Sequence, residues 1–478
     1  MHLGIDIGTS SVKAILLGPD GAIAAQASAP LSVSRPRSGW SEQDPADWWA
    51  ATGTAVTALP ADLRRAVAAI GLAGQMHGAT LLDADDRVLR PAILWNDGRS
   101  MAECAAFEAA APRSRAISGN LAMPGFTAPK LGWVRRHEPA IFAATRTVLL
   151  PKDYVRLRMT SDRATDLSDA SGTLWLDVGA RDWSDELLAA SGLSRAQMPT
   201  LHEGTAFTGT LRADIAADWG MDRVPVAAGG GDNAAGALGV GVTGEGQGML
   251  SLGTSGVIFV ATDRFRPNPA RAVHAFCHCL PGTWHQMSVH LSAASCLDWG
   301  ARLTGLDVAS FLAAAEAAPE DASALFLPYL AGERTPLNDP HVRGALVGLD
   351  HDSDAGRVAR AVLEGVAFAH ADGIAALREA GTTISALTVI GGGARSRFWG
   401  TILAAALDVR LDYVAGSEVG PALGAARLAE LAATGAAPAE LCPPPVPVFS
   451  IDPDRGLAAR LAPRLARFRA AQTAIRNM

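Results

Sequence analysis

The chain opens with two short apolar stretches on either side of a small polar turn. Leu3 to Ile7 and Val12 to Leu16 consist largely of aliphatic residues, and Gly8-Thr9-Ser10 separates them. Short apolar runs bounded by turn residues are typical of strands. The pattern therefore predicts a hairpin of two buried strands. Asp6 is the exception within it, because an ionised carboxylate is rarely buried without a partner.

The same pattern returns in the second half of the chain. Residues 248–260 read GMLSLGTSGVIFV, with Gly253-Thr254-Ser255 at the expected turn. Each half also carries an apolar stretch that ends in three glycines before an expected helix, at 229–231 and at 391–393. Gly-Thr-Ser turns and helix N-termini offer N–H groups and hydroxyls to anions. Four such motifs in matched order predict a duplicated phosphate-binding unit rather than ordinary tight turns.

The two copies differ in their acidic residues. Alignment of the Gly-Thr-Ser turns places Asp6 opposite Ser251, and alignment of the triple glycines places Asp232 opposite Ala394. Both carboxylates therefore belong to the first half, which predicts that one half supplies the acids while the other holds nucleotide. Asp6 is tolerable in a strand if it faces a cleft that holds a cation.

Between these motifs, apolar runs with strand and helix spacing alternate. A duplicated α/β architecture with a central cleft follows from this alternation. The glycine-rich segment 241–246 is the natural boundary, so we expect domains at 1–243 and 244–478. The arginine-rich tail after Pro445 is expected to be peripheral. The pattern predicts a helix from Pro45, strands at 67–72 and 91–95, and a helix over 361–377.

Composition and charge narrow the functional class. The length of 478 residues allows two or three domains, and the net charge of −7 argues against a nucleic-acid partner. No apolar run reaches the length of a membrane helix, and Met1 to Gly4 lead directly into a strand, so no signal peptide is expected. Five cysteines without a CxxC pair fit a reducing compartment, which predicts a cytoplasmic protein. The chain has no Gly-Lys-Ser/Thr, which excludes the P-loop.

Two longer motifs make the chain resemble the FGGY family of carbohydrate kinases. Residues 125–134 (GFTAPKLGWV) are similar to the first family signature, and residues 344–364 (GALVGLDHDSDAGRVARAVLE) are similar to the second. Arg357 replaces the residues that are usual at its place in the second signature. This place is not a catalytic position. The resemblance covers nearly the whole chain. It implies two duplicated actin-like, ribonuclease-H-like domains on either side of a cleft.

Within the family, three short motifs resemble the members that phosphorylate D-xylulose. These are 74–78 (GQMHG), 94–99 (LWNDGR) and 230–233 (GGDN). Glycerol kinases carry an Arg-Glu pair where this chain has Met76-His77, which disfavours glycerol. The resemblance thus implies ATP-dependent formation of D-xylulose 5-phosphate with Mg²⁺, a sugar and ATP as small-molecule partners, and no nucleic-acid or membrane partner. A homodimer is compatible with it.

The resemblance assigns catalytic roles to the two acids. Asp232 is implied to be the general base that receives the proton of the sugar hydroxyl. The alternative is that Asp232 only caps the following helix. Asp6 is implied to be the metal-side carboxylate, holding Mg²⁺ through water. The alternative is a buried carboxylate that accepts hydrogen bonds from backbone amides at the turn.

The motifs also name binding residues. Met76 and His77 are expected to contact the sugar and Trp95 to stack on it, and Asn96, Asp232 and Asn233 are further expected substrate-binding residues. A histidine or tryptophan at such a place is otherwise often a packing residue. Asp97 and Lys152 are further candidate sugar contacts. The expected phosphate-channel residues are Thr9, Ser10, Thr254 and Ser255, and Gly392 and Gly393 are expected near the adenosine.

The sequence allows four other interpretations. Gly229-x-Gly231-x-x-Ala234 satisfies a dinucleotide fingerprint, but no acidic residue follows at the next strand end, which disfavours it. His274, Cys277, His278 and Cys279 lack a second ligand pair at zinc spacing, which favours a buried strand. A kinase of another ketose or polyol shares every motif except the sugar contacts. An actin-like or chaperone ATPase gives no reason for Met76-His77 or Trp95-Asn96-Asp97.

Overall fold

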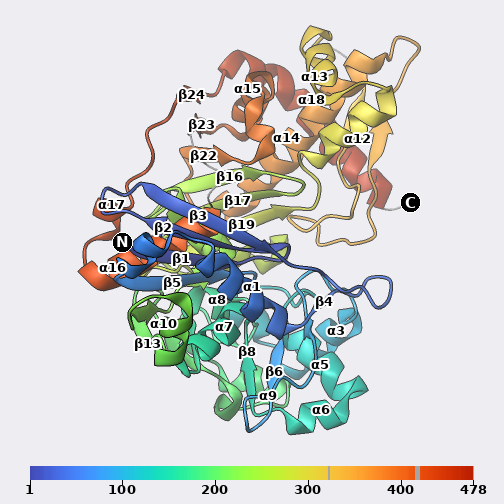
Figure 1. Ribbon diagram of the computed structural model, residues 1–478. Coiled ribbons are helices and arrows are strands. Elements are labelled where there is room, and N and C mark those ends of the chain that lie inside the picture. Colours follow the sequence, from blue (N-terminus) through green and yellow to red (C-terminus); the bar gives the residue numbers. More distant parts are fainter. Residues whose placement is uncertain (321–322, 415–419, 477–478) are drawn as a thin grey trace.

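A mixed sheet in each half of the chain forms the framework of the molecule (Figure 1). The computed structural model describes residues 1–320, 323–414 and 420–476. The first sheet has the strand order β13-β14-β5-β1-β2-β3, with the short β15 beside β5. Its strands are β1 (His2–Ile7), β2 (Ser11–Leu17), β3 (Ile23–Pro30), β5 (Ala69–Gly74), β13 (Phe207–Thr210), β14 (Pro225–Ala227) and β15 (Gly230–Gly231).

The second sheet repeats this arrangement with the order β18-β19-β17-β16-β22-β23-β24. In each sheet a hairpin, β1–β2 or β16–β17, is extended by a third antiparallel strand on one side and by parallel strands on the other. The predicted duplicated fold class is confirmed. The strands of the second sheet are β16 (Gly248–Leu252), β17 (Gly256–Thr262), β18 (His274–Cys277), β19 (Trp284–His290), β22 (Ala386–Ile390), β23 (Arg410–Tyr413) and β24 (Phe449–Ile451).

Helices and smaller strand pairs cover these sheets. In the first half they are α1 (Pro45–Thr57), α2 (Ala61–Arg65), α3 (Met101–Ala110), α4 (Ser114–Ser118), α5 (Thr127–His137), α6 (Pro139–Ala144), α7 (Pro151–Thr160), α8 (Leu167–Ser171), α9 (Asp185–Ala190), α10 (Ala213–Trp219) and α11 (Asp232–Gly239), with the short strands β4 (Glu42–Gln43), β6 (Thr80–Leu82), β7 (Ala92–Ile93), β8 (Thr147–Leu149), β9 (Ala164–Asp166), β10 (Leu176–Asp177), β11 (Asp182–Trp183) and β12 (Thr200–His202). In the second half they are α12 (Ser295–Thr304), α13 (Val308–Ala317), α14 (Ala355–Glu379), α15 (Arg397–Leu407), α16 (Gly420–Thr434), α17 (Pro438–Leu441) and α18 (Arg455–Arg476), with β20 (Leu325–Leu327) and β21 (Ala345–Val347).

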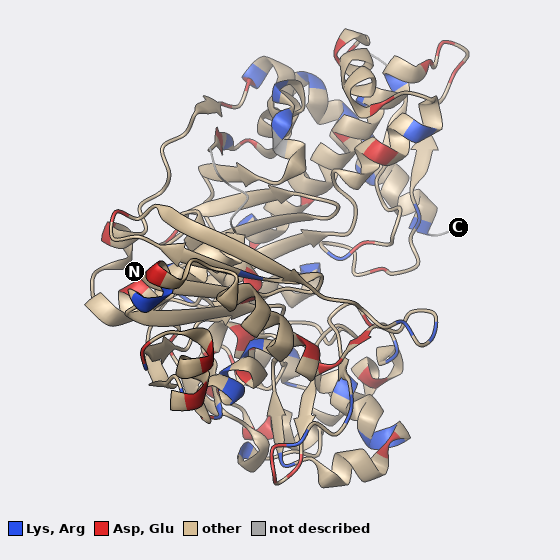
Figure 2. Ribbon diagram, viewed as in Figure 1, with Lys and Arg blue, Asp and Glu red and all other residues tan. Residues whose placement is uncertain are grey.

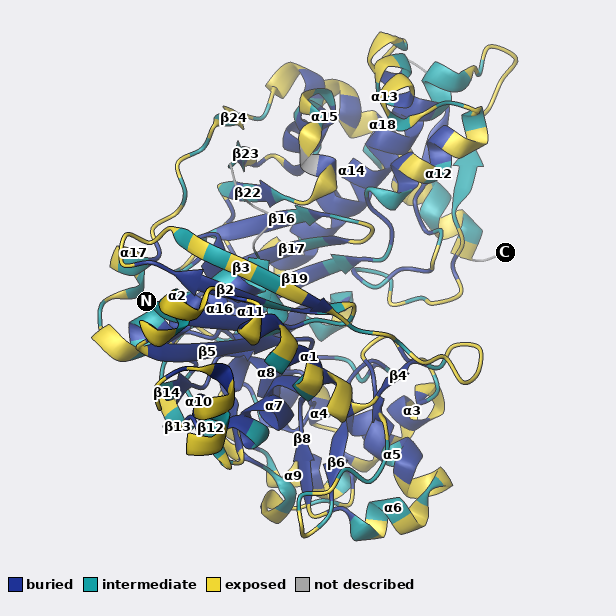
Figure 3. Ribbon diagram, in the orientation of Figure 1, coloured by how far each residue is buried: buried dark blue, intermediate teal, exposed yellow. Residues whose placement is uncertain are grey.

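The predicted helices lie where the apolar spacing placed them. Helix α1 begins at Pro45, and the side chain of Asp44 caps it by accepting a hydrogen bond from the Ala46 amide at 2.9 Å. Helix α14 extends the predicted 361–377 at both ends and is buried along most of its length. Figure 3 shows the central strands of both sheets as buried, whereas the edge strand β3 alternates exposed and less exposed residues. This alternation is typical of a strand with one solvated face.

Helix α16 belongs to the second half in sequence but packs on the first sheet. In Figure 1 it lies beside β1 and β5. Glycines permit this approach: a Cβ added at Gly4 would lie 2.1 Å from the Ala422 carbonyl oxygen, and one at Gly71 would lie 1.9 Å from that of Ala425. Either contact would be a severe clash, so the bare backbone of β1 and β5 is what admits the helix.

The expectation of a peripheral tail is wrong. Strand β24 pairs with β23 at the edge of the second sheet, and α18 places Phe468 fully inside the core. Arg464 extends from the same helix to the buried Glu364 of α14, with Nε 2.6 Å from Oε2. An arginine can bury its aliphatic stem while its head pairs with a carboxylate, so arginine-rich composition did not mean exposure here.

Charged side chains lie mainly on helices and loops, and in the view of Figure 2 both signs are mixed over the two halves. The five cysteines are buried and none forms a disulfide. Within the described ranges, no helix has the length and hydrophobicity needed to cross a membrane.

Candidate active site

A cavity of about 180 Å³ between the two halves collects most of the predicted sugar-binding residues. From the first half it is lined by Met76, His77, Trp95, Asp232 and Asn233. The second half contributes Ser255, Val257, His274, Phe276, Met287, Val289 and Arg334. Residues that are far apart in the sequence thus meet at one small concave site, which is typical of a site for a small polar molecule.

Asp232 is the first residue of α11 and directly follows the glycines of β15. Its Oδ1 accepts hydrogen bonds from the Asn233 amide at 2.7 Å and from Asn233 Nδ2 at 2.9 Å. Oδ2 has no hydrogen-bond partner among the described residues. Burial raises the pKa of Asp232 to about 6, and the Asn233 hydrogen bonds oppose that rise. The carboxylate is therefore held through one oxygen while the other is available to a ligand.

Buried polar groups form hydrogen bonds with the backbone segment that precedes Asp232. Arg156 donates from Nη1 to the Ala227 carbonyl oxygen at 2.9 Å and from Nη2 to that of Ala228. The Gly231 amide donates to Ser168 Oγ at 3.0 Å. These bonds fix the backbone that presents Asp232, so its carboxylate occupies a defined place in the cavity.

Asp6 lies near Asp232, in β1, with Lys13 opposite it on β2. Burial and the neighbouring Asp232 charge raise the pKa of Asp6 to about 7, while Lys13 acts in the other direction. Its Oδ1 is buried and has no hydrogen-bond partner among the described residues. The alternative that backbone amides satisfy this oxygen is thus not what the structure shows. Two close carboxylates with an unsatisfied oxygen form a place that a cation would stabilise.

His77 is held in one protonation state. Its Nδ1 lies 2.7 Å from the Gly172 carbonyl oxygen, which can only accept, so Nδ1 carries the proton. Burial and the charge of Lys130 lower the pKa of His77 well below its ordinary value, so the ring is neutral. Nε2 is then a hydrogen-bond acceptor. Gly172 leaves room for this ring, because a Cβ there would lie 2.5 Å from His77 Cε1.

Trp95 connects the cavity to the first Gly-Thr-Ser turn. Its Nε1 donates to Thr9 Oγ1 at 3.1 Å, and the ring is 39% exposed, so it offers an open face at the site. Asn96 follows on the same turn but is exposed and does not line the cavity.

The two further candidates for sugar contact have other partners. Asp97 is buried, accepts from the Ser41 amide at 2.6 Å, and pairs with Arg99 through Nη2 and Oδ2 at 2.6 Å. Lys152 is fully buried below the site. Its Nζ contacts three carboxylates, those of Asp153 at 2.6 Å, Asp166 at 2.8 Å and Asp169 at 3.3 Å. Neither side chain lines the cavity.

The second half contributes a wall that the motifs did not indicate. His274 lies on β18, the buried strand that was expected from its cysteines and histidines. Asn120 donates from Nδ2 to the Ser118 and Ala275 carbonyl oxygens, so its Oδ1 is the acceptor that faces His274 Nδ1 at 3.1 Å. Burial lowers the pKa of His274 to about 3. His274 is therefore neutral with an acceptor at Nε2, as His77 is. A histidine on a hydrophobic strand was the available signal.

The predicted nucleotide side shows open hydroxyls and one open glycine. Thr254 and Ser255 are exposed at the turn between β16 and β17, and Ser255 also reaches the sugar cavity. A Cβ at Gly392 would meet open space, whereas one at Gly393 would lie 2.8 Å from the Leu252 side chain. Gly392 is thus placed for a ligand to approach its backbone, and Gly393 is packed against the second sheet.

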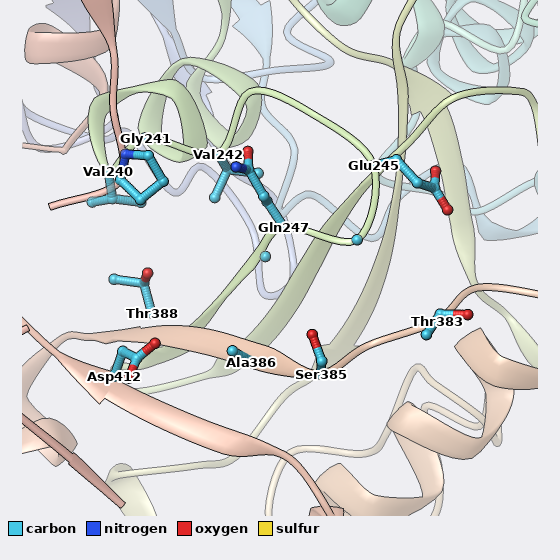
Figure 4. Close-up of a pocket in the computed structure, with 13 residues that line it drawn as sticks. Val240, Gly241, Val242, Glu245, Gln247, Thr383, Ser385, Ala386, Thr388 and Asp412 are labelled. Atoms are coloured by element: carbon cyan, nitrogen blue, oxygen red, sulfur yellow. The ribbon is translucent and has the colours of Figure 1, made fainter. Parts of the chain in front are cut away.

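A second cavity, of about 440 Å³, lies between the connector and strands β22 and β23 of the second sheet (Figure 4). In it the connector residues Val242, Glu245 and Gln247 face Thr388 and Asp412 of β22 and β23. Parallel strands present their carboxyl ends to ligands in open α/β sheets. This space at the amino ends is therefore separate from the candidate site and borders the connector between the two halves.

Known proteins share this sequence and fold over nearly the whole chain. The xylulose kinase of Escherichia coli K12 is 58% identical over 436 residues, which covers 91% of this chain and 90% of that protein. The crystal structure of a kinase named xyloylose kinase from Brucella ovis is 51% identical, has a TM-score of 0.97 and covers 100% of this chain and 99% of that one. The xylulose kinase structure from Rhodospirillum rubrum is 29% identical with a TM-score of 0.92, covering 100% and 99%.

Family profiles match both halves. Residues 1–239 match the N-terminal domain of the FGGY family of carbohydrate kinases, and residues 248–433 match its C-terminal domain. The two matches leave the connector that borders the second cavity between them. With a sugar-sized cavity between two matched domains, the chain belongs to the FGGY family of carbohydrate kinases.

Proposed function

We propose that this kinase transfers the γ-phosphoryl group of ATP to O5 of D-xylulose and forms D-xylulose 5-phosphate and ADP. The observation that carries the proposal is that Met76, His77 and Asp232 line one cavity. The proteins named as xylulose kinases that cover most of the chain support the choice of sugar.

In the proposed step Asp232 is the general base. The O5 atom attacks the γ-phosphorus and forms the new O–P bond, while the bond from phosphorus to the bridging oxygen breaks and ADP leaves with the electron pair. The O5 proton passes to Asp232. A pKa of about 6 suits this role, because the group is ionised at neutral pH yet basic enough to take the proton late in the transfer.

The site fits Mg²⁺ on the side of Asp6. The carboxylate has a buried oxygen without a hydrogen-bond partner among the described residues, and the Asp232 charge nearby opposes its ionisation. We propose that Asp6 holds the ion through water, as Mg²⁺ keeps several waters in most protein sites. When bound, Mg²⁺ neutralises charge on the phosphates.

The remaining predicted residues receive roles on the same basis. Thr254 and Ser255 line the phosphate channel with Thr9 and Ser10, and Gly392 lets the adenosine approach the backbone, with Gly393 behind it. Asn233 holds Asp232, Met76 contacts the carbon edge of the sugar, and His77 accepts from a sugar hydroxyl. Trp95 stacks on the sugar, and Asn96 stays a predicted contact. A cytoplasmic location and a homodimer also stay predictions.

The alternative of an actin-like or chaperone ATPase is set aside, because the chain belongs to a family of carbohydrate kinases. The test of the sugar is a coupled assay of ADP release across ketoses and polyols. We expect D-xylulose to be used far better than glycerol or L-ribulose. Equal turnover of the three would overturn the sugar assignment, and a strong preference for another ketose or polyol would replace it.

A further inference from the structure

Arg334 extends from the second half into the sugar cavity and brings a positive charge with it. Among the described residues its guanidinium forms no ion pair or hydrogen bond, although the charge of the neighbouring Glu333 acts on it. The other arginines near the cores are paired, as Arg99 is with Asp97 and Arg360 is with Glu364. Holding an unpaired guanidinium in a largely closed site costs free energy, which a ligand can recover by accepting its hydrogen bonds.

The backbone on both sides of Arg334 is fixed by buried groups. Glu333 accepts from the Arg334 amide at 2.8 Å and from the Leu291 amide at 3.0 Å, through the same Oε1. Thr335 donates its amide to the Val289 carbonyl oxygen at 3.0 Å and accepts from the Val289 amide at 3.1 Å. Both flanking residues are thereby fastened to β19 and its end. Arg334 is held in place from a rigid strand, which is how specific binding groups are positioned.

Its guanidinium lies at the histidine end of the cavity. A Cβ added at Gly125 would lie 3.8 Å from Nη2 of Arg334. The Arg334 charge contributes to lowering the pKa of both His77 and His274, after burial. The pKa of Asp232 is set instead by burial and by Asn233. The cavity therefore offers hydrogen-bond acceptors on two histidines and a donor on Arg334, in addition to the proposed base Asp232.

The chemistry of a 2-ketopentose matches this set of groups. If O5 is free to attack phosphorus, it cannot also close a ring onto C2, so the reacting sugar is open and C2 is a carbonyl. The carbonyl oxygen only accepts hydrogen bonds, whereas the hydroxyls also donate. With O5 at Asp232, we place the keto end against His77, His274 and Arg334, which line the same cavity.

We propose that Arg334 is a substrate-binding residue that donates a hydrogen bond to the C2 carbonyl oxygen and so selects the open keto form of the sugar. The inference rests on the proposed function, because it takes a ketopentose as the substrate. Reduction at C2 adds one hydrogen to the carbon and one to the oxygen, and the tetrahedral carbon moves the oxygen out of the plane of the former carbonyl. Xylitol and D-arabitol, the two products of that reduction, should therefore lose the Arg334 interaction.

The test compares Arg334→Met and Arg334→Lys with wild type on D-xylulose, xylitol and D-arabitol. Loss of a charge-assisted hydrogen bond should raise the KM for D-xylulose by about 10- to 100-fold in R334M, with a smaller change in kcat. The preference in kcat/KM for D-xylulose over the pentitols should fall by about 10-fold or more, and R334K should lie in between. Arg302 of α12 is exposed, so Arg302→Met serves as the matched control and should behave as wild type.

Thermal melting would first establish that R334M is folded. A folded R334M whose KM and ketose preference stay within about twofold of wild type would overturn the proposal. Should R334M not fold, R334K decides by the same ratio. Failure of the proposed function has a separate signature: the wild type itself would release no ADP with D-xylulose.

Discussion

The two Gly-Thr-Ser turns share three residues, but their hairpins differ in length by one residue, because Ile7 pairs with Val12 whereas Leu252 pairs with Gly256. In the first turn the Thr9 hydroxyl donates to Gln75 Oε1 at 2.9 Å and accepts from Trp95. In the second turn the Thr254 carbonyl oxygen accepts from the Ala293 amide at 2.9 Å, and the Thr254 hydroxyl has no partner among the described residues. The Thr9 hydroxyl thus has partners within the protein, so Thr9 can bind phosphate only through its backbone amide, whereas the Thr254 hydroxyl is left for a ligand.

The strands before the two turns also differ in the side chains that they carry. Asp6 lies opposite Lys13 in the first hairpin, and Ser251 lies opposite Val257 in the second. Only the first hairpin combines a carboxylate with a nearby cation and a second carboxylate, that of Asp232. Two hairpins with the same turn motif therefore carry unequal chemistry. The comparison teaches that the turn motif specifies a hairpin, while the neighbouring side chains decide whether it serves catalysis or nucleotide binding.

The largest expected effect is at Asp232. Removal of a general base typically costs about 10²–10⁴-fold in rate, so D232A should lose kcat by that factor with nucleotide affinity little changed. Steady-state ADP release and nucleotide titration measure the two quantities. Asp307, whose side chain caps α13, is the control: D307A should lower the melting temperature and leave kcat alone. Near-normal kcat in D232A would return Asp232 to a helix-end role.

The next prediction compares Asp6 of the first hairpin with Ser251, the residue at the matching place in the second hairpin. Asp6→Asn is nearly isosteric and should lower Mg²⁺-dependent turnover by about 10- to 100-fold, the usual cost of losing a group that holds a metal through water. Ser251→Ala, at the matching place in the second hairpin, should change turnover little. Titration of turnover with Mg²⁺ measures both. Equal responses of the two variants would refute the assignment of the metal side to the first hairpin.

The rate should also depend on pH through the ionisation of Asp232 in the first half. Asp232 acts as a base only when ionised, and its pKa is about 6. We therefore expect kcat/KM to fall about tenfold for each pH unit below 6. Asp6 interacts with Asp232, so the apparent value belongs to the pair. A profile that is flat from pH 7 down to pH 5 would contradict a buried carboxylate base.

A smaller effect separates the two turns. Thr254→Ala should raise the KM for ATP by about 2- to 10-fold, as expected for one neutral hydrogen bond to a ligand. Thr9→Ala should instead lower the melting temperature, because it leaves Gln75 and Trp95 without their partner. A larger change of the ATP KM in T9A than in T254A would reverse the roles given to the turns.

The smallest effect is on stability. The pKa of Asp6 is raised in the folded state to about 7, above its ordinary value near 4. The folded protein thus holds a proton that the unfolded chain releases, and this contribution is complete below pH ~4 and lost as pH rises to about 7. Melting between these pH values should show a steeper loss of stability in wild type than in D6N. Parallel curves would mean that Asp6 carries its charge at no cost.

Much of the framework was predictable because local pattern decides it. The two hairpins, the glycine-ended strands and α14 follow from apolar spacing and turn residues, and the sequence also indicated that Met76, His77 and Asp232 belong to one site. These features depend on short segments whose own residues specify them. Tertiary structure then added what short segments cannot encode.

The missed features depend on contacts between distant segments. Nothing in the alanine-rich sequence of α16 names its partner, which is the glycine backbone of the other half. Arg334 and His274 lie on separate segments of the second half and meet Met76 and His77 of the first half only at the shared cavity. Lys152 was a candidate sugar contact, but its Nζ contacts three buried carboxylates instead.

The position of α16 also has a consequence for the order in which the protein can be completed during its synthesis. The first sheet and α11 have left the ribosome well before Gly420, the first residue of α16, is added. At the usual rate of ~5–20 residues per second, the growing chain waits roughly ten to forty seconds for the helix that covers Gly4 and Gly71. During that time one face of β1 and β5 lacks its final cover. The first half is therefore encoded first but finished almost last.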